Sequence, residues 1–284
     1  MGADDLEDNL DLGFNEEKVI VEETTASDNT PSHNKRTIED VENDITQLEA
    51  PKQKKAKGKR VNHLSSDPEF VRNFASLPVE QILQYFNINL KNEEDESKAP
   101  FLFSKNDFKD TASYKKEDRK LTKFNDFLQT FINQKDAKTK TIIIAATNIR
   151  VADIHRAVQM TEDETNSKVL KGIKLFNKNK LKQDIDTIVN ISKSKDEKYK
   201  LAKNYITTPV RLMTILDTMK GDKKYDNLWL KDKSKLDIVV DVQFLINSAK
   251  NVSIINDFQT VYQLLDVLKT LKQIKGNSLR IVLY

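Results

Sequence analysis

The fold is decided by the stretch Leu236-Asp237-Ile238-Val239-Val240-Asp241-Val242-Gln243-Phe244. Its short run of β-branched apolar residues is typical of a strand that is buried on both faces of a parallel sheet. In open α/β sheets, ligands bind just beyond the carboxyl ends of such strands, and Asp241 stands at that position. The residues that follow it offer no second acid, no base and no nucleophile. The stretch therefore predicts the position of an active site without the side chains that catalysis needs.

Working outward from this strand, apolar patterns alternate between strand and helix from Thr141 to Tyr284. The segments expected to form strands are 141–146, 172–176, 203–208, 236–241 and 279–284. Apolar residues at helical spacing predict a helix after each of the first four strands, and one at 121–131 before them. Alternation of this kind is the signature of a parallel sheet with helices on both faces, so we predict an α/β fold.

Residues 1–62 have almost no apolar periodicity and are predicted to be a disordered tail, acidic at first and then rich in lysine. Ordering such a segment costs roughly 1–2 kcal/mol per residue, which its small apolar area does not offset. The basic run at 51–60 fits a nuclear localisation signal or an RNA-contacting arm, and the alternative is a solvated linker. The residues assigned to the localisation signal are Lys52, Lys54, Lys55, Lys57, Lys59 and Arg60.

Two short helices are expected between the tail and the main domain. A capping-box pattern formed by Ser66 and Glu69 predicts the start of the first helix, and Pro78 lies at the start of the second. Residues 63–110 are therefore assigned to a helical extension and charged linker packed against something larger, and residues 111–284 to the main domain. No apolar run approaches the ~20 residues of a membrane span, so no membrane contact is expected.

The chain lacks the residues that most kinds of catalysis need. It has no cysteine, no two of its six glycines are spaced for a phosphate-binding loop, and its three histidines are scattered. Asp237 precedes Asp241 by four residues and so shares its face of the strand, where its expected role is solvation at the strand edge. Asp241 retains two alternatives, binding a cation or ordering a loop. We expect no catalytic residue, metal, cofactor or small-molecule substrate.

Two predicted helix starts carry groups that suit a backbone phosphate. Thr208 and Arg211 supply a hydroxyl, free helix N–H groups and a guanidinium, and Asn148 and Arg150 hold the equivalent place after an earlier strand. Both starts are expected at the carboxyl edge of the sheet, which is the edge where the parallel strands end. The alternative is a capped helix with a surface arginine. The residues predicted to bind RNA are Thr147, Asn148, Arg150, Thr208 and Arg211.

Three segments, in this order, resemble motifs of the first RecA-like domain of DEAD-box helicases. Residues 147–152 (TNIRVA) stand where that family has P-T-R-E-L-A, 208–212 (TPVRL) where it has T-P-G-R-L, and 240–244 (VDVQF) where it has V-x-D-E-A-D. In those helicases the first two motifs contact the RNA backbone, and the third positions magnesium and the attacking water. Here the phosphate loop is absent and Val242 replaces the catalytic Glu. We therefore expect a degenerate, single-lobed RecA-like (P-loop-NTPase-like) domain without ATPase activity.

The ordered set of marks over residues 66–284 is similar to the CMS-one family, subunits of the small-subunit processome, a large nucleolar pre-ribosome. The marks are the acidic head, the Lys-rich arm, Ile149-Arg150-Val151-Ala152-Asp153, Lys174-Leu175-Phe176, the Thr-Pro-x-Arg turn and a C-terminal Leu-Tyr strand. The resemblance implies a non-catalytic assembly factor of the nucleus and nucleolus that acts in ribosome biogenesis and rRNA processing. Its implied partners are pre-rRNA or a snoRNA-containing pre-ribosomal complex and other assembly factors.

Two other functions stay open at this point. The first is an ATP-dependent RNA helicase or NTPase whose missing groups come from a partner, and it would need a triphosphate grip that the sequence does not offer. The second is a pure protein-interaction scaffold whose carboxyl edge is covered by a partner. A scaffold that touches no RNA would lack the salt-dependent RNA binding that phosphate contacts produce.

Overall fold

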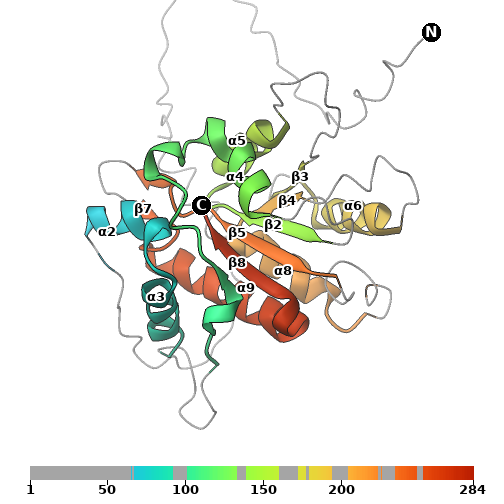
Figure 1. Cartoon of the computed structure of the whole chain (residues 1–284). Helices are drawn as coiled ribbons and strands as arrows, with labels where there is room; N and C mark the ends of the chain where they lie inside the picture. The colour runs from blue at the N-terminus through green and yellow to red at the C-terminus, as the bar shows by residue number, and fades with distance from the viewer. Residues whose placement is uncertain are drawn as a thin grey trace, which may run out of the picture. The chain divides into compact units, whose positions relative to one another are not determined.

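The computed structural model describes residue 65 and the ranges 67–91, 101–132, 139–159, 172–176, 179–193, 204–222, 225, 234–247 and 252–284 (Figure 1). These residues belong to one compact unit, Lys57–Tyr284. The predicted tail at 1–62, with the assigned localisation signal, lies outside the described residues. Within the described ranges, no helix is long and apolar enough to cross a membrane.

A parallel sheet of six strands forms the centre of this unit. The strands lie in the order β1 (Phe108–Lys109), β8 (Leu279–Leu283), β5 (Leu236–Val240), β2 (Lys140–Ile144), β4 (Asn204–Thr207) and β3 (Gly172–Leu175). β5 lies between β8 and β2, and all its residues are buried. The buried central strand predicted from the β-branched run is therefore confirmed.

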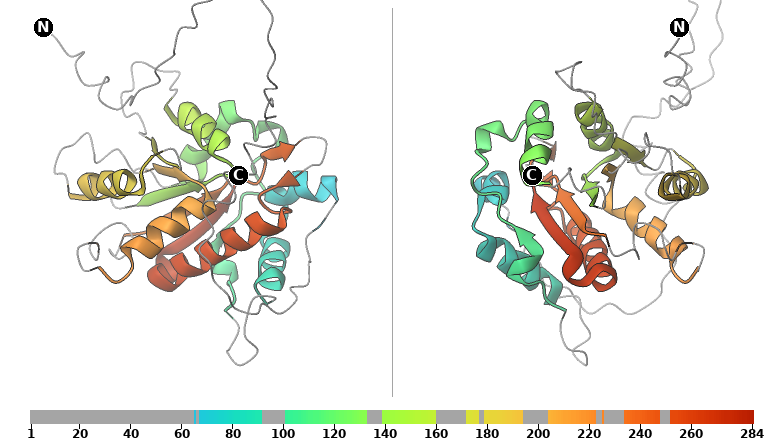
Figure 2. Two further views of the ribbon diagram at one scale, coloured as in Figure 1. Left: turned by 180° about the vertical axis from the view of Figure 1, so that it is seen from behind. Right: turned by 45° about the vertical axis from the view of Figure 1, so that its right-hand side comes forward.

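Helices cover both faces of the sheet (Figures 1 and 2). α4 (Phe124–Phe131) and α5 (Asn148–Gln159) lie on one face, which we call the α5 face. α6 (Leu181–Lys193), α8 (Pro209–Met219) and α9 (Phe258–Lys275) lie on the other, the α8 face. The predicted α/β fold with helices on both faces is confirmed. Right-handed crossovers explain why the helices divide between the two faces. The connection from β2 to β3 runs toward one edge of the sheet, whereas the connections from β3 to β4, β4 to β5 and β5 to β8 run toward the other.

Alternate residues of β5 face opposite sides of the sheet. Val239 joins the core on the α5 face with Phe127 and Tyr284, whereas Ile238 and Val240 join the core on the α8 face. The period of two then places Asp237 and Asp241 on the α5 face. Their predicted position on one face of the strand follows from this alternation.

The predicted extension packs into the core on the α8 face through α2 (Pro68–Asn73) and α3 (Val79–Lys91). The first helix begins differently from the prediction, because Asp67 is the N-cap and its Oδ1 accepts the N–H of Glu69 at 2.9 Å. β1 ends the extension and joins the main sheet beside β8, although two residues were too short to predict. The hairpin of β6 (Leu245–Asn247) and β7 (Val252–Ser253) was also not predicted. Short 3-10 turns lie at Phe74–Ser76, Lys105–Asp107, Lys116–Asp118, Leu121–Lys123 and Gly276–Ser278.

Candidate functional site

The crevice between β2 and β5 is where a sheet with this strand order would bind a ligand. β2 leads into α5 on one face, whereas β4 and β5 lead into helices on the other, so the chain diverges between the ends of β2 and β5. Arg150, from the first turn of α5, and Asp241, at the end of β5, meet at this point. The sequence analysis singled out both residues but did not pair them.

Arg150 and Asp241 form an ion pair inside the crevice. Nε of Arg150 donates to Oδ2 of Asp241 at 2.6 Å, and Nη2 donates to Oδ1 at 3.5 Å. The guanidinium carbon also lies 5.1 Å from the centre of the Phe244 ring, a cation–π arrangement. The Asp241 side chain is 0% exposed and that of Arg150 is 12% exposed. The protein's own charges therefore occupy the position where open α/β sheets bind their ligands.

Asp241 is buried because the hydrogen bonds of the sheet continue past the end of β5. The N–H of Asp241 donates to the carbonyl of Ile144 at 2.9 Å, and the N–H of Val242 donates to that of Tyr284 at 3.0 Å. Burial raises the pKa of Asp241, while Arg150 and two backbone N–H groups oppose that rise by favouring the carboxylate. Of the two alternatives for Asp241, this geometry favours an ordering role, since its charge already has a partner.

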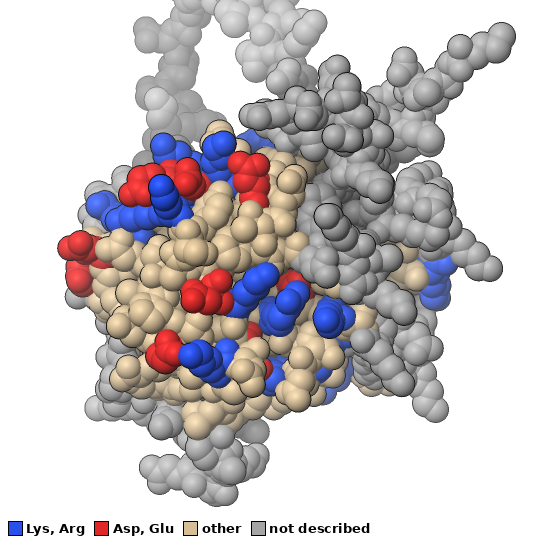
Figure 3. Space-filling view, in the orientation of Figure 1, with Lys and Arg blue, Asp and Glu red and all other residues tan. Residues whose placement is uncertain are grey.

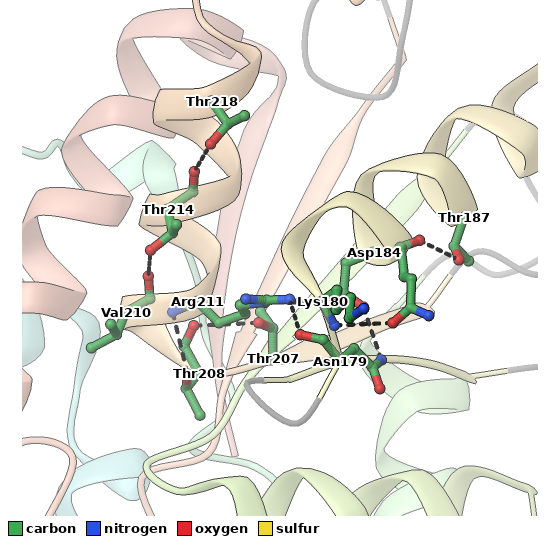
Figure 4. A network of polar contacts seen from close by, with 11 residues as sticks. Asn179, Lys180, Asp184, Thr187, Thr207, Thr208, Val210, Arg211, Thr214 and Thr218 are labelled. Atoms are coloured by element: carbon green, nitrogen blue, oxygen red, sulfur yellow. Dashed lines mark hydrogen bonds and ion pairs between the residues drawn. The ribbon is translucent and has the colours of Figure 1, made fainter. Parts of the chain in front are cut away.

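Arg211 is buried between α8 and α6, where the prediction had a guanidinium free to hold a phosphate (Figure 4). Its Nε donates to Oδ2 of Asp184 at 2.8 Å, and Nη2 donates to the carbonyl of Asn179 at 2.9 Å. The Asp184 side chain is 2% exposed, and burial raises its pKa against the opposing effect of Asn179 and Arg211. The expected surface arginine is thus half of an internal ion pair.

The two predicted threonines cap the helices that follow them. Oγ1 of Thr147 accepts the N–H of Arg150 at 3.2 Å, and Oγ1 of Thr208 accepts the N–H of Arg211 at 3.4 Å. Oδ1 of Asn148 is buried with no hydrogen-bond partner in the described part of the chain. All five residues lie on the carboxyl edge as predicted, but α5 and α8 take the two arginines to opposite faces. Their binding to RNA stays a prediction.

A third arginine, Arg119, holds the carboxyl end of β8 and was missed by the sequence analysis. Its Nη1 donates to the carbonyl of Leu283 at 3.1 Å, and its Nη2 donates to the carbonyls of Ala75 at 3.1 Å and Thr111 at 2.6 Å. Burial lowers the pKa of Arg119 to about 10. No local pattern marks this residue, because its partners come from three separate parts of the chain.

The expected role of Asp237 was wrong. Its side chain is 0% exposed and accepts hydrogen bonds from Nε and Nη2 of Arg280, at 2.7 and 2.9 Å. Asp237 and Arg280 are register partners on β5 and β8, so the pair forms across the sheet instead of at its edge. Burial raises the pKa of Asp237, and Arg280 opposes the rise.

The carboxyl edge is therefore occupied by arginines bound to internal carboxylates and carbonyls. Arg119 lies at β8, Arg150 at β5 and β2, and Arg211 at the start of the helix after β4. Among the described residues, no group of three or more His, Asp or Glu side chains could hold a metal ion. The arrangement can fix the loops of this edge in place, and its two acids, Asp241 and Asp184, are already paired with Arg150 and Arg211.

The sequence is similar to a known protein. Protein CMS1 of Saccharomyces cerevisiae is 31% identical to this chain over 217 residues, which are 74% of the chain. The chain covers 66% of that relative's length, just under two thirds. No protein-family model and no solved structure matches the chain. On the strength of this identity, the chain belongs to the CMS1 family.

Proposed function

We propose that this chain is a non-catalytic assembly factor of the nucleolar small-subunit pre-ribosome, and that it binds RNA or RNP through a degenerate RecA-like, helicase-like domain. Membership of the CMS1 family supports the role in ribosome biogenesis. Its proposed partners are pre-rRNA or a snoRNA-containing pre-ribosomal complex and other assembly factors. The α/β sheet with its ordered motif-like segments supports the relation to helicases.

The ion pair between Arg150 and Asp241 is the main observation that supports a non-catalytic role. In the helicases that the chain resembles, the corresponding acid positions magnesium. Here a metal ion would have to displace a guanidinium from a carboxylate that is 0% exposed. Val242, at the place of the catalytic Glu, is also 0% exposed and packs in the apolar core on the α8 face. Both features favour a domain that holds its shape without turning over nucleotide.

The experiment is a pair of measurements on the purified full-length chain. We expect no ATP hydrolysis above background and no rise in melting temperature with ATP and Mg²⁺, because the sequence has no phosphate-binding glycine loop and Val242 replaces the catalytic acid. We expect binding to single-stranded RNA that weakens with salt, since phosphate contacts release counterions. ATP turnover that is lost in Asp241→Ala would show the catalytic assignment to be wrong.

Localisation to the nucleus and nucleolus is part of the same proposal. Deleting residues 51–60 is expected to move the protein out of the nucleus and to leave the melting temperature of the domain unchanged, because this charged run lies outside the periodic sequence. Fluorescence microscopy of the tagged deletion variant checks this expectation. Unchanged nuclear signal in a folded variant would assign import to another segment or to a partner.

A protein-interaction scaffold is the second candidate, and one observation favours it. Of the six large apolar side chains that are exposed among the described residues, four lie at the starts of α5, α8 and α9 or in β6. These four are Ile149, Val210, Phe258 and Ile246. Their position at the carboxyl edge suits contact with protein better than with phosphate. The same salt series separates the two functions, because a scaffold alone would show no salt-dependent RNA binding.

A further inference from the structure

Three cations surround Asp237 on the α5 face, at the opposite end of the strands from the carboxyl edge. They are Lys109 of β1, Arg280 of β8 and Lys235, which immediately precedes β5, and we call them the strand-face cluster. All three act electrostatically on the Asp237 carboxylate. One acid among three cations leaves a net charge of about +2, so the cluster is more basic than its internal ion pair needs.

Strand order and alternation place these side chains together. β1, β8 and β5 are neighbours in the sheet, and Lys109 pairs in register with Val282, two residues from Arg280. Val239 and Val282 belong to the core on the α5 face, so Lys235 and Arg280 follow on that same face by the period of two. Neighbouring strands are about 4.8 Å apart, which spreads the three cations over roughly 10 Å.

The cluster extends from a buried acid to the protein surface. Val239 and Val282 belong to the core under α4 and α5, and the Asp237 side chain in the next row is 0% exposed. The Arg280 side chain is 33% exposed, and Lys235 is exposed. Figure 3 shows several Lys and Arg side chains in the middle of the face that is turned to the viewer, with Asp and Glu side chains beside them.

We propose that the strand-face cluster is a contact surface for the phosphate backbone of single-stranded RNA. This inference deepens the proposed function by moving the RNA contact from the carboxyl edge to the amino-terminal half of the α5 face. Arg150 and Arg211, the predicted RNA contacts, each form an ion pair with a buried carboxylate. The strand-face cluster has three cations around one acid, Asp237, and so keeps an excess of positive charge. A surplus of positive charge at the surface is the electrostatic footprint of a nucleic-acid contact.

Phosphate suits this surface better than an apolar partner does. Arg280 holds Asp237 through Nε and Nη2, and a guanidinium has five N–H donors. Lys109 gives one donor to the carbonyl of Phe131 at 2.6 Å and an ammonium has three. The exposed Asp110, which follows Lys109 in the chain, lowers the positive surplus by about one charge, and its Oδ1 accepts the N–H of Ala112. Within the described ranges, these contacts use two donors of Arg280 and one of Lys109, so the surface combines further donors with positive charge.

The test compares the full-length chain with the variant Lys109→Gln/Lys235→Gln, which removes two charges and keeps the pair of Asp237 with Arg280. The matched control is Lys182→Gln/Lys220→Gln, which removes two exposed lysines from α6 and from the end of α8, on the other face. The probe is a fluorescent oligouridylate, titrated between 50 and 200 mM salt. The cluster variant is expected to lose about 0.7 in salt slope per phosphate contact, about 1.4 in all. The control should keep the wild-type slope.

Each other outcome overturns the proposal. Equal slopes for wild type and the cluster variant would exclude the surface, and equal losses in both variants would show that only total charge matters. If the cluster variant kept its RNA affinity but lost association with RNase-treated pre-ribosomal particles, the surface would contact an acidic protein instead. Failure of the wild type to bind RNA would contradict the proposed function itself. Lys235→Glu, at an exposed position, replaces the double variant if Lys109→Gln disturbs packing against α4.

Discussion

Replacing Arg150 with alanine is expected to lower the free energy of unfolding by about 3–5 kcal/mol. The change leaves Asp241, whose side chain is 0% exposed, as a buried carboxylate without its countercharge. It also removes the guanidinium that lies over Phe244. A loss of this size is a large part of the 5–15 kcal/mol that typically separates folded from unfolded protein. Urea denaturation followed by circular dichroism measures it.

A double variant without either charge tests whether the loss comes from the ion pair. Arg150→Met combined with Asp241→Leu removes both charges and keeps apolar volume in the crevice, so its stability is expected to lie much closer to the wild type than that of Arg150→Ala. If Arg150→Ala alone cost less than about 1 kcal/mol, the pair would behave like an exposed ion pair and the closed crevice would be wrong.

Arg211→Ala is expected to lower the free energy of unfolding by a similar amount, about 3–5 kcal/mol, because it leaves the carboxylate of Asp184 buried between α6 and α8 without a countercharge. The change also removes the donor to the carbonyl of Asn179, which fixes the segment before α6. Placed in the first turn of α8, the guanidinium would oppose the helix dipole unless an anion were near, and Asp184 is that anion.

Arg156→Ala is the matched control for this prediction. Arg156 also pairs with an aspartate, Asp153, but its side chain is 71% exposed, so its loss is expected to cost no more than about 1 kcal/mol. The comparison uses urea denaturation of all three proteins under one condition. If Arg211→Ala and Arg156→Ala were equally stable, the internal ion pair would be wrong, and Arg211 would be a surface residue as its sequence position predicts.

The helix starts at the carboxyl edge could be predicted because their signals are local. Thr208 caps α8 and Pro209 follows it at the first helical position, so three or four consecutive residues contain the whole cause. β5 was equally predictable, because a β-branched run bounded by charges favours a strand wherever it lies. β1 was not, since a strand of two residues has no periodicity and forms only because β8 is beside it.

The sequence by itself determined the alternation of strands and helices, the helix caps and the absence of residues for most catalytic chemistries. Only the tertiary structure decided what the charged residues do. Arg150 and Asp241 are 91 residues apart, and Arg211 and Asp184 are 27 apart. Strand order and crossover handedness bring each pair together, and these depend on contacts across the whole sheet. A charged side chain looks the same in the sequence whether it faces water, a phosphate or a buried partner, and only packing removes the water that separates these cases.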